Sequence, residues 1–156
     1  MSTSLNASES VADDVAVPAF PSMRLTQPVT VVILGASGDL TQRKLLPGLY
    51  AMYAQGFLPV DFSVVGFARR DYDDAEFRRI AADAVRRFSR IPVRDEVLAG
   101  FCEHIFYHKG DIEQYEAYRS LNTRLFDRRQ FPPNHLYYLS IRPELFAPVL
   151  AHMKAT

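Results

Sequence analysis

The chain has 156 residues, 48% of them hydrophobic and 23% charged, with one cysteine and 18 basic against 18 acidic side chains. This balance is typical of a globular domain and excludes a fibrous chain or a disulfide-stapled scaffold. The zero net charge predicts no general attraction to nucleic acid or to an anionic membrane. Because no apolar run could span a membrane and residues 1–21 lack a signal-peptide pattern, we expect a cytoplasmic protein.

The amino-terminal stretch is rich in Ser, Ala, Asp and Pro without sustained periodicity, and we expect residues 1–27 to form a flexible tail. A single domain is then expected over 28–156. The β-branched run at 29–34 predicts a strand buried on both faces of a parallel sheet. Apolar spacing predicts a helix over 38–54, with a kink or restart just before Pro47, which lacks an amide hydrogen.

The rest of the chain alternates between strands and helices. We expect strands at 62–67, 105–108 and 136–141, and helices at 73–88, about 92–101 and 111–129. Asp73 and Glu76 have the spacing of a capping box, and the arginines beside that helix, including Arg78 and Arg86, are interpreted as a solvated face. The alternation predicts an α/β fold, a doubly wound parallel sheet of the Rossmann-like kind, incomplete with about four strands.

The turn after the first expected strand has the pattern of a dinucleotide site. It reads Gly-Ala-Ser-Gly-Asp-Leu-Thr over 35–41, with two glycines three residues apart. Glycine lets the backbone approach a pyrophosphate closely, and the free amides and positive dipole end of the next helix attract the anion. A plain tight turn is the alternative, but the position between a buried strand and an amphipathic helix favours dinucleotide binding.

The end of the second expected strand bears on which dinucleotide is bound. Sites for NAD usually place an acidic residue there to accept the ribose hydroxyl, whereas this chain has Arg69 and Arg70. Guanidinium groups can hydrogen-bond a 2′-phosphate and stack on an adenine, so NADP is the expected cofactor. Asp111, after the third strand, is expected to border the cofactor or to cap the following helix, and both roles can hold together.

These residues resemble the glucose-6-phosphate dehydrogenase family. The resemblance rests on Gly-Ala-Ser-Gly-Asp-Leu with Lys44 and Pro47 at fixed distance, on Val-Gly-Phe-Ala-Arg at 65–69, and on the 136–141 strand followed by a proline. It spans about 29–153. It implies oxidation of the first carbon of glucose 6-phosphate to a lactone, with hydride transfer to NADP, by a full-length enzyme that forms a homo-oligomer.

The resemblance also implies roles for individual residues. The cofactor would be held by Gly35, Ala36, Ser37, Gly38, Asp39, Leu40, Thr41, Gln42, Arg69, Arg70, Asp111 and Ile112. Lys44 resembles the family's lysine near the sugar phosphate, and a solvated helix lysine is the alternative. Thr41 stands where the family commonly has alanine, and we expect its hydroxyl to loosen the helix packing slightly.

The family's catalytic histidine, its paired aspartate and a lysine-proline substrate motif belong after the last expected strand. None of this chain's histidines matches them: His104, His108, His135 and His152. We therefore expect no catalytic residue and no metal site in this chain. The catalytic carboxyl-terminal domain is expected to be absent, because the chain is a fragment or a truncated product. Cys102 is interpreted as a small buried apolar residue, with a nucleophile beside His104 or His108 as the alternative.

The sequence leaves one alternative to a dehydrogenase open and disfavours another. A freestanding NADP-binding module without a catalytic partner domain remains an alternative. A short-chain reductase or epimerase is disfavoured, because those enzymes need a Tyr-x-x-x-Lys pair and no tyrosine here has a lysine four residues later.

Overall fold

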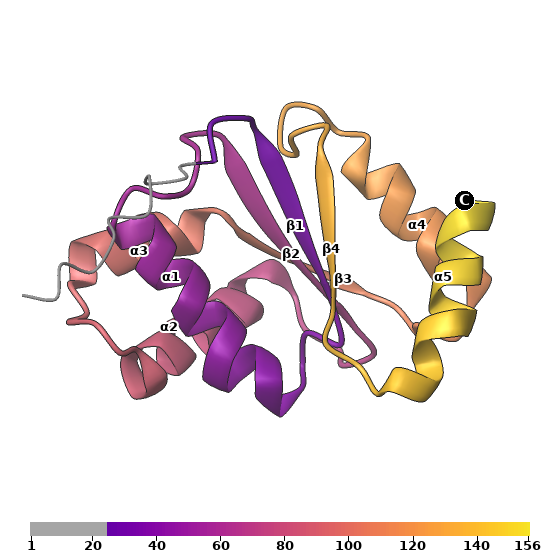
Figure 1. Ribbon diagram of the computed structural model, residues 1–156, viewed down its shortest axis with the longest axis horizontal. Coiled ribbons are helices and arrows are strands. Elements are labelled where there is room, and N and C mark those ends of the chain that lie inside the picture. The colour runs from indigo at the N-terminus through magenta and orange to yellow at the C-terminus, as the bar shows by residue number, and fades with distance from the viewer. Residues whose placement is uncertain (1–24) are drawn as a thin grey trace, which may run out of the picture.

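A computed structural model describes residues 25–156 as a four-stranded sheet with helices on both faces (Figure 1). The strands are β1 (Val29–Leu34), β2 (Phe62–Ala68), β3 (Ile105–Lys109) and β4 (His135–Leu139). They lie in the order β3-β2-β1-β4, and every neighbouring pair is parallel. The predicted α/β fold with a parallel sheet is therefore confirmed. β2 and β3 lie on one side of β1 and β4 on the other, so the chain changes direction across the sheet beside β1.

Helices cover both faces of this sheet, as Figure 1 shows. One face carries α1 (Leu46–Ala54), α2 (Asp74–Phe88) and α3 (Asp95–Glu103), and the other carries α4 (Tyr115–Leu125) and α5 (Phe146–Ala155). A π-helical turn, η1 (Thr41–Leu45), leads into α1, and a 3₁₀ turn, η2 (Pro143–Leu145), leads into α5. The carboxyl ends of the strands lie at the lower edge of Figure 1, where the loops that line the candidate site emerge.

Each face of the sheet has its own apolar core. Val31 and Ile33 of β1 pack under α1, α2 and α3, whereas Val32 and Leu34 pack toward α4 and α5. β2 is buried along its whole length and β1 along all but its first residue. A strand covered on both faces needs apolar side chains at every position, which explains the continuous apolar runs in the sequence.

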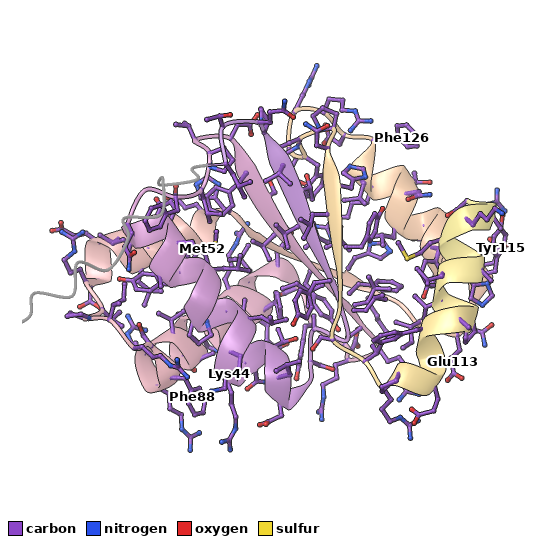
Figure 2. The ribbon with its side chains drawn as sticks, in the orientation of Figure 1. Lys44, Met52, Phe88, Glu113, Tyr115 and Phe126 are labelled. Carbon is purple, nitrogen blue, oxygen red and sulfur yellow. The ribbon has the colours of Figure 1, made fainter. Side chains whose placement is uncertain are left out.

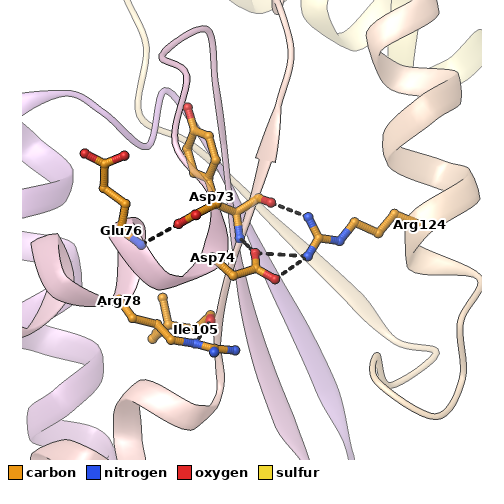
Figure 3. A network of polar contacts seen from close by, with 7 residues as sticks. Asp73, Asp74, Glu76, Arg78, Ile105 and Arg124 are labelled. Carbon is orange, nitrogen blue, oxygen red and sulfur yellow. Dashed lines mark hydrogen bonds and ion pairs between the residues drawn. The ribbon is translucent and has the colours of Figure 1, made fainter.

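Two local predictions are confirmed. The helix before Pro47 is interrupted as expected: the Leu46 N–H donates to the Thr41 carbonyl five residues back, and a regular helix resumes from there. Because Pro47 has no amide hydrogen, a widened turn ahead of it is tolerated. At the start of α2, the Asp73 carboxylate accepts from the Glu76 N–H at 2.7 Å, which is the N-cap bond of the expected capping box (Figure 3).

The predicted helix over 111–129 is wrong at both ends. The Asp111 carboxylate accepts from the Glu113 N–H at 3.0 Å and its carbonyl accepts from the Gln114 N–H, so these residues form a turn and α4 begins only afterwards. An Asp side chain competes for nearby backbone N–H groups, which favours a turn over a first helical turn. Asp127 accepts similarly from the Arg129 N–H at 3.1 Å, beyond the end of α4. The last strand also ends at Leu139 and not at 141.

Most of the expected flexible tail, residues 1–24, lies outside the described residues. Within its last three residues, the Leu25 N–H donates to the Phe57 carbonyl at 3.1 Å. The chain is therefore attached to the loop after α1 before β1 begins.

An ion pair joins α2, β3 and α4 on the side of the sheet where β3 forms the edge (Figure 3). Both Asp74 oxygens accept from the Arg124 guanidinium, at 2.8 and 3.0 Å, and Asp74 also accepts from the Tyr107 N–H at 2.6 Å. Arg124 donates in addition to the Tyr107 carbonyl. Both charged side chains are about two-thirds buried, so the pair satisfies its hydrogen bonds largely away from water.

The solvated-face interpretation is wrong for Arg78. This half-buried side chain donates to the Ile105 carbonyl at 2.8 Å and lies over the Phe106 ring. Its planar guanidinium can bond a carbonyl at the start of β3 and stack on a ring at once. Arg86 stays exposed and pairs with Asp95 at 3.2 Å, as expected for a surface residue.

Arg124→Met is expected to lower the free energy of unfolding by about 2 to 3 kcal/mol, because it leaves the partly buried Asp74 without its cationic partner. Urea denaturation of the purified chain measures this. Arg119→Met is the matched control on the same helix, since the one ion pair of Arg119 among the described residues is with the exposed Glu116, and the control should cost at most about 0.5 kcal/mol. Equal losses from the two variants would contradict the structural role of Arg124.

Candidate cofactor-binding site

The turn after β1 passes between the carboxyl ends of β2 and β4. The N–H groups of Gly35 and Ala36 donate to the Phe67 carbonyl, at 2.9 and 3.3 Å, and the Gly38 N–H donates back to the Gly35 carbonyl at 3.0 Å. The Ser140 N–H donates to the Leu34 carbonyl at 2.9 Å. The turn is therefore held from both sides, and the chain is helical from residue 39 onward.

Gly35 is required at this turn on two grounds. Its φ is +84°, in the left-handed region that side chains disfavour. A Cβ atom here would lie 2.2 Å from the Ser140 carbonyl oxygen and 2.9 Å from the Ile141 side chain. Only glycine allows the β1 backbone to pass this close to the end of β4.

A pocket of about 320 Å³ opens beside this turn. It is lined by Gly35, Ser37, Gly38, Ala68, Arg69, Arg70, Ile112 and Ser140. Six of these residues were expected from the sequence at one cofactor site, and they come from the loops after β1, β2 and β3. Pockets at this position, at the carboxyl edge beside the change of direction, are where open α/β sheets bind ligands.

Arg69 and Arg70 follow β2 and are both exposed. Within residues 25–156, no carboxylate forms an ion pair with either guanidinium. Asp71, the next residue, is paired with Lys109 at 3.0 Å. Two guanidinium groups therefore face the pocket without a compensating carboxylate, which favours an anionic ligand.

Other expected residues do not line this pocket. Ala36 and Thr41 are buried, Asp39 pairs with Arg43 at 2.8 Å, and Leu40 is exposed. Gln42 faces α2 in a separate pocket, and the half-buried Asp111 forms the turn described above. These residues support the turn or the first helical residues and do not line the pocket itself.

The described contacts of Thr41 give no support to the expectation that its hydroxyl loosens the helix packing. Its side chain is fully buried, and its hydroxyl lies 3.4 Å from the Gly35 carbonyl oxygen and 3.2 Å from the Ser140 hydroxyl. A hydroxyl at this position can therefore find acceptors within the turn and beyond β4. It links the start of the helix to both sides of the Gly35 contact.

Lys44 lies on the α1 side of the molecule, near Phe88 (Figure 2). Its exposed side chain borders two further pockets, an apolar one of about 290 Å³ with Leu136 and Tyr138, and one of about 240 Å³ with Arg43 and Arg90. Both lie outside the pocket with Arg69. The structure thus separates Lys44 from the expected residues that line the pocket with Arg69.

The nucleophile alternative for Cys102 finds no support in its surroundings. The thiol is half-buried, and burial raises its pKa, so the protonated and less reactive form is favoured. The His104 Nδ1 lies 2.8 Å from the Phe62 carbonyl oxygen, and burial lowers the pKa of His108. Within the described residues, no cluster of three His, Cys, Asp or Glu side chains could hold a metal ion, and no helix could cross a membrane.

A parallel sheet with this strand order, a glycine turn after β1 and a pocket at the carboxyl edge define a dinucleotide-binding domain. The family described as "Glucose-6-phosphate dehydrogenase, NAD binding domain" matches residues 32–156. The chain belongs to this family, as its sequence resemblance predicted. The family's description indicates a nicotinamide dinucleotide cofactor.

Individual relatives agree with this assignment. The chain is 37% identical over 135 residues to glucose-6-phosphate 1-dehydrogenase of Chlamydia pneumoniae and 36% identical over 132 residues to the chloroplastic enzyme of Nicotiana tabacum. These matches cover 85% and 81% of this chain but only 26% and 22% of the relatives. The chain thus spans about a quarter of their length.

A solved structure of glucose-6-phosphate dehydrogenase in complex with its substrate glucose-6-phosphate superposes with a TM-score of 0.73. Its sequence is 27% identical, and the match covers 85% of this chain and 28% of that one. The match confirms the fold of the described residues.

Two pocket residues, Ala68 and Ser140, were not expected from the sequence. Both stand at the carboxyl ends of strands, Ala68 as the last residue of β2 and Ser140 just after β4. The rule that ligands bind at these ends could have pointed to them. Which neighbours they meet depends on the strand order, which the linear sequence does not contain.

Gly35→Ala is expected to destabilise the chain by at least about 2 kcal/mol and to abolish binding of both NADP and NAD, because the new methyl group overlaps the Ser140 backbone. Urea denaturation and nucleotide titration measure the two effects. Gly48→Ala is the control: nothing lies within 4 Å of a Cβ there, and alanine in mid-helix should stabilise the chain by about 0.5 to 1 kcal/mol. A Gly35→Ala chain that still binds either nucleotide at full stability would contradict this account.

Proposed function

We propose that this chain is the NADP-binding part of a glucose-6-phosphate dehydrogenase. The whole protein would oxidise D-glucose 6-phosphate at its first carbon to 6-phosphoglucono-1,5-lactone, with NADP as hydride acceptor. One observation carries the proposal: in a member of this family, the glycine turn and two guanidinium groups that have no carboxylate partner within residues 25–156 line the same pocket. The proposal includes a cytoplasmic location and a homo-oligomeric full-length enzyme, both expectations from the sequence.

The residues present fit a dinucleotide with a 2′-phosphate. Gly35, Ser37 and Gly38 of the turn line the pocket, and the first N–H groups of the following helix have no intrahelical acceptor, so they could bind a pyrophosphate there. Arg69, with Arg70 beside it, would hold the 2′-phosphate, and Ile112 and Ala68 offer apolar contact to the adenosine. Bound NADP would supply the nicotinamide that accepts the hydride.

The other expected residues would support the pocket without lining it. Ala36, Asp39, Leu40, Thr41 and Gln42 would shape the turn and the helix start, and Asp111 would hold the loop that carries Ile112. Lys44 would approach the sugar phosphate from the α1 side. Its exposure supports this role, because an ammonium group at an open surface can meet a second ligand that lies outside the nucleotide pocket.

Arg69→Ala is expected to weaken NADP binding about tenfold to a hundredfold while NAD binding stays nearly constant. The reason is that a charge-assisted hydrogen bond to the 2′-phosphate contributes roughly 1.5 to 3 kcal/mol and NAD lacks that phosphate. Isothermal titration of both nucleotides to the purified chain measures the change. Arg70→Ala should shift NADP affinity in the same direction by less.

Arg86→Ala serves as the control for this experiment. Arg86 is an exposed arginine on α2 that pairs with Asp95 outside the pocket, so its loss removes the same charge from the chain without touching the site. Its NADP and NAD affinities should match those of the unmodified chain. If Arg69→Ala shifts both nucleotides equally, or neither, the assignment of NADP to this pocket is wrong.

The purified chain is expected to bind NADP without oxidising glucose 6-phosphate. Hydride transfer needs an oriented sugar and a general base, and none of the four histidines lines the pocket with Arg69. The ultraviolet absorbance of NADPH measures turnover with glucose 6-phosphate present. Turnover above background by the chain alone would contradict the claim that it lacks the groups needed for hydride transfer.

A further inference from the structure

The hydroxyl of Tyr107 reaches from β3 to the arginine segment after β2. It lies 2.7 Å from the Arg70 carbonyl oxygen and 3.0 Å from the Ala68 carbonyl oxygen. A phenol carries one hydrogen, so the two carbonyls share a single donor. Arg69 is the residue between them, and the backbone on both of its sides is therefore held by one side chain.

The two carbonyls differ in what else they contact. The Ala68 carbonyl also accepts from the Gly110 N–H at 2.9 Å, as part of the connection between β2 and β3. Among the described residues, the Arg70 carbonyl accepts only from Tyr107. The ion pair of Asp71 with Lys109 also links this segment to β3, but it is exposed and contributes little in water. The Tyr107 hydroxyl is thus the main polar restraint on the segment.

Tyr107 itself is held firmly. The residue is 2% exposed, and its ring packs 5.0 Å from the Phe77 ring and 5.4 Å from the Tyr72 ring. Its backbone N–H and carbonyl both belong to the Asp74 and Arg124 network. A side chain restrained at its ring and its backbone can restrain a neighbouring loop, whereas a mobile one would move with it.

We propose that Tyr107 is a positioning residue for cofactor selectivity, whose hydroxyl fixes the backbone around Arg69 so that the guanidinium is already directed at the 2′-phosphate before NADP binds. This inference rests on the proposed function, since it needs Arg69 to contact that phosphate. Ordering a flexible arginine on binding weakens affinity, and ordering it in the free protein avoids that loss. Burial raises the pKa of Tyr107 to about 12, so the hydroxyl keeps its proton at neutral pH.

Tyr107→Phe removes only the hydroxyl and leaves the packed ring. We expect NADP affinity to fall about threefold to tenfold while NAD affinity is unchanged, a smaller loss than for Arg69→Ala because a neutral hydrogen bond acts at one remove. Adenosine 2′,5′-bisphosphate and adenosine 5′-monophosphate repeat the comparison with probes that differ mainly in the 2′-phosphate. In the double variant with Arg69→Ala, the Tyr107→Phe change should cost no further NADP affinity.

Two further variants separate positioning from general stability. Tyr50→Phe removes another buried hydroxyl, which accepts from the Arg94 N–H at 3.2 Å outside the pocket, and should leave the ratio of NADP to NAD affinity unchanged. Replacement of Tyr107 by 4-aminophenylalanine returns N–H donors to the same carbonyls and should restore NADP affinity. Thermal melts of all variants show whether each is folded.

The outcomes distinguish the two proposals. If Arg69→Ala is selective but Tyr107→Phe shifts NADP and NAD equally, or shifts neither, the positioning role is overturned and the cofactor assignment stands. Additive losses in the double variant would also overturn it, because Tyr107 would then act independently of Arg69. If Arg69→Ala is not selective, the cofactor assignment fails and the role of Tyr107 fails with it. If Tyr107→Phe unfolds the chain, the 4-aminophenylalanine variant decides: without normal selectivity in a folded chain, the role is overturned.

Discussion

The arrangement of this domain depends on the close approach of β1 to the end of β4 at Gly35. The Cβ that any other residue would carry there overlaps the Ser140 backbone, and the positive φ turns the chain away from the sheet within one residue. That sharp turn lets the next helix start at the carboxyl edge, with its free N–H groups beside the pocket. Thr41 adds polar contacts across the same junction. The junction therefore shapes the backbone half of the proposed cofactor site.

The side-chain half of the proposed site depends on a different set of contacts. Arg69 and Arg70 follow a strand buried on both faces, so the position where they leave the sheet is determined by the core. Beyond that point the segment is exposed, and β3 holds it through the Tyr107 hydroxyl and the Lys109 ion pair. β3 is in turn joined to α2 and α4 by Asp74 and Arg124. Polar contacts at the edge of the sheet thus restrain the loop that carries Arg69 and Arg70.

Much of this could be predicted from the sequence, and the failures have two physical causes. Continuous apolar runs identified β1 and β2, and local signals identified the interruption before Pro47 and the Asp73 cap, because these features involve residues close in sequence. Asp111 was misplaced because the same side chain can cap a helix or a turn, and the sequence does not decide between them. The contacts of Arg78 and Tyr107 could not be predicted because their partners are far away in the sequence, at the start of β3 and at the end of β2. Pocket residues from three loops could be assigned to one site because ligands bind at the carboxyl ends of parallel strands. That rule applies even when the contacts between the loops are not known.

The two halves of the proposed site differ in what a substitution there can change. Backbone N–H groups at the glycine turn would meet the pyrophosphate that NAD and NADP share, so changes at Gly35 are expected to alter the binding of both and the stability of the sheet. Under the proposed function the arginines would meet a group that only NADP has, and they project from an exposed segment whose side chains contribute little to the core. Selectivity can therefore vary with small effects on folding, provided that β3 still orders the segment. A guanidinium discriminates between ligands only when its position is defined. On the proposed role, the buried Tyr107 on β3 would therefore contribute to cofactor selectivity together with the arginines.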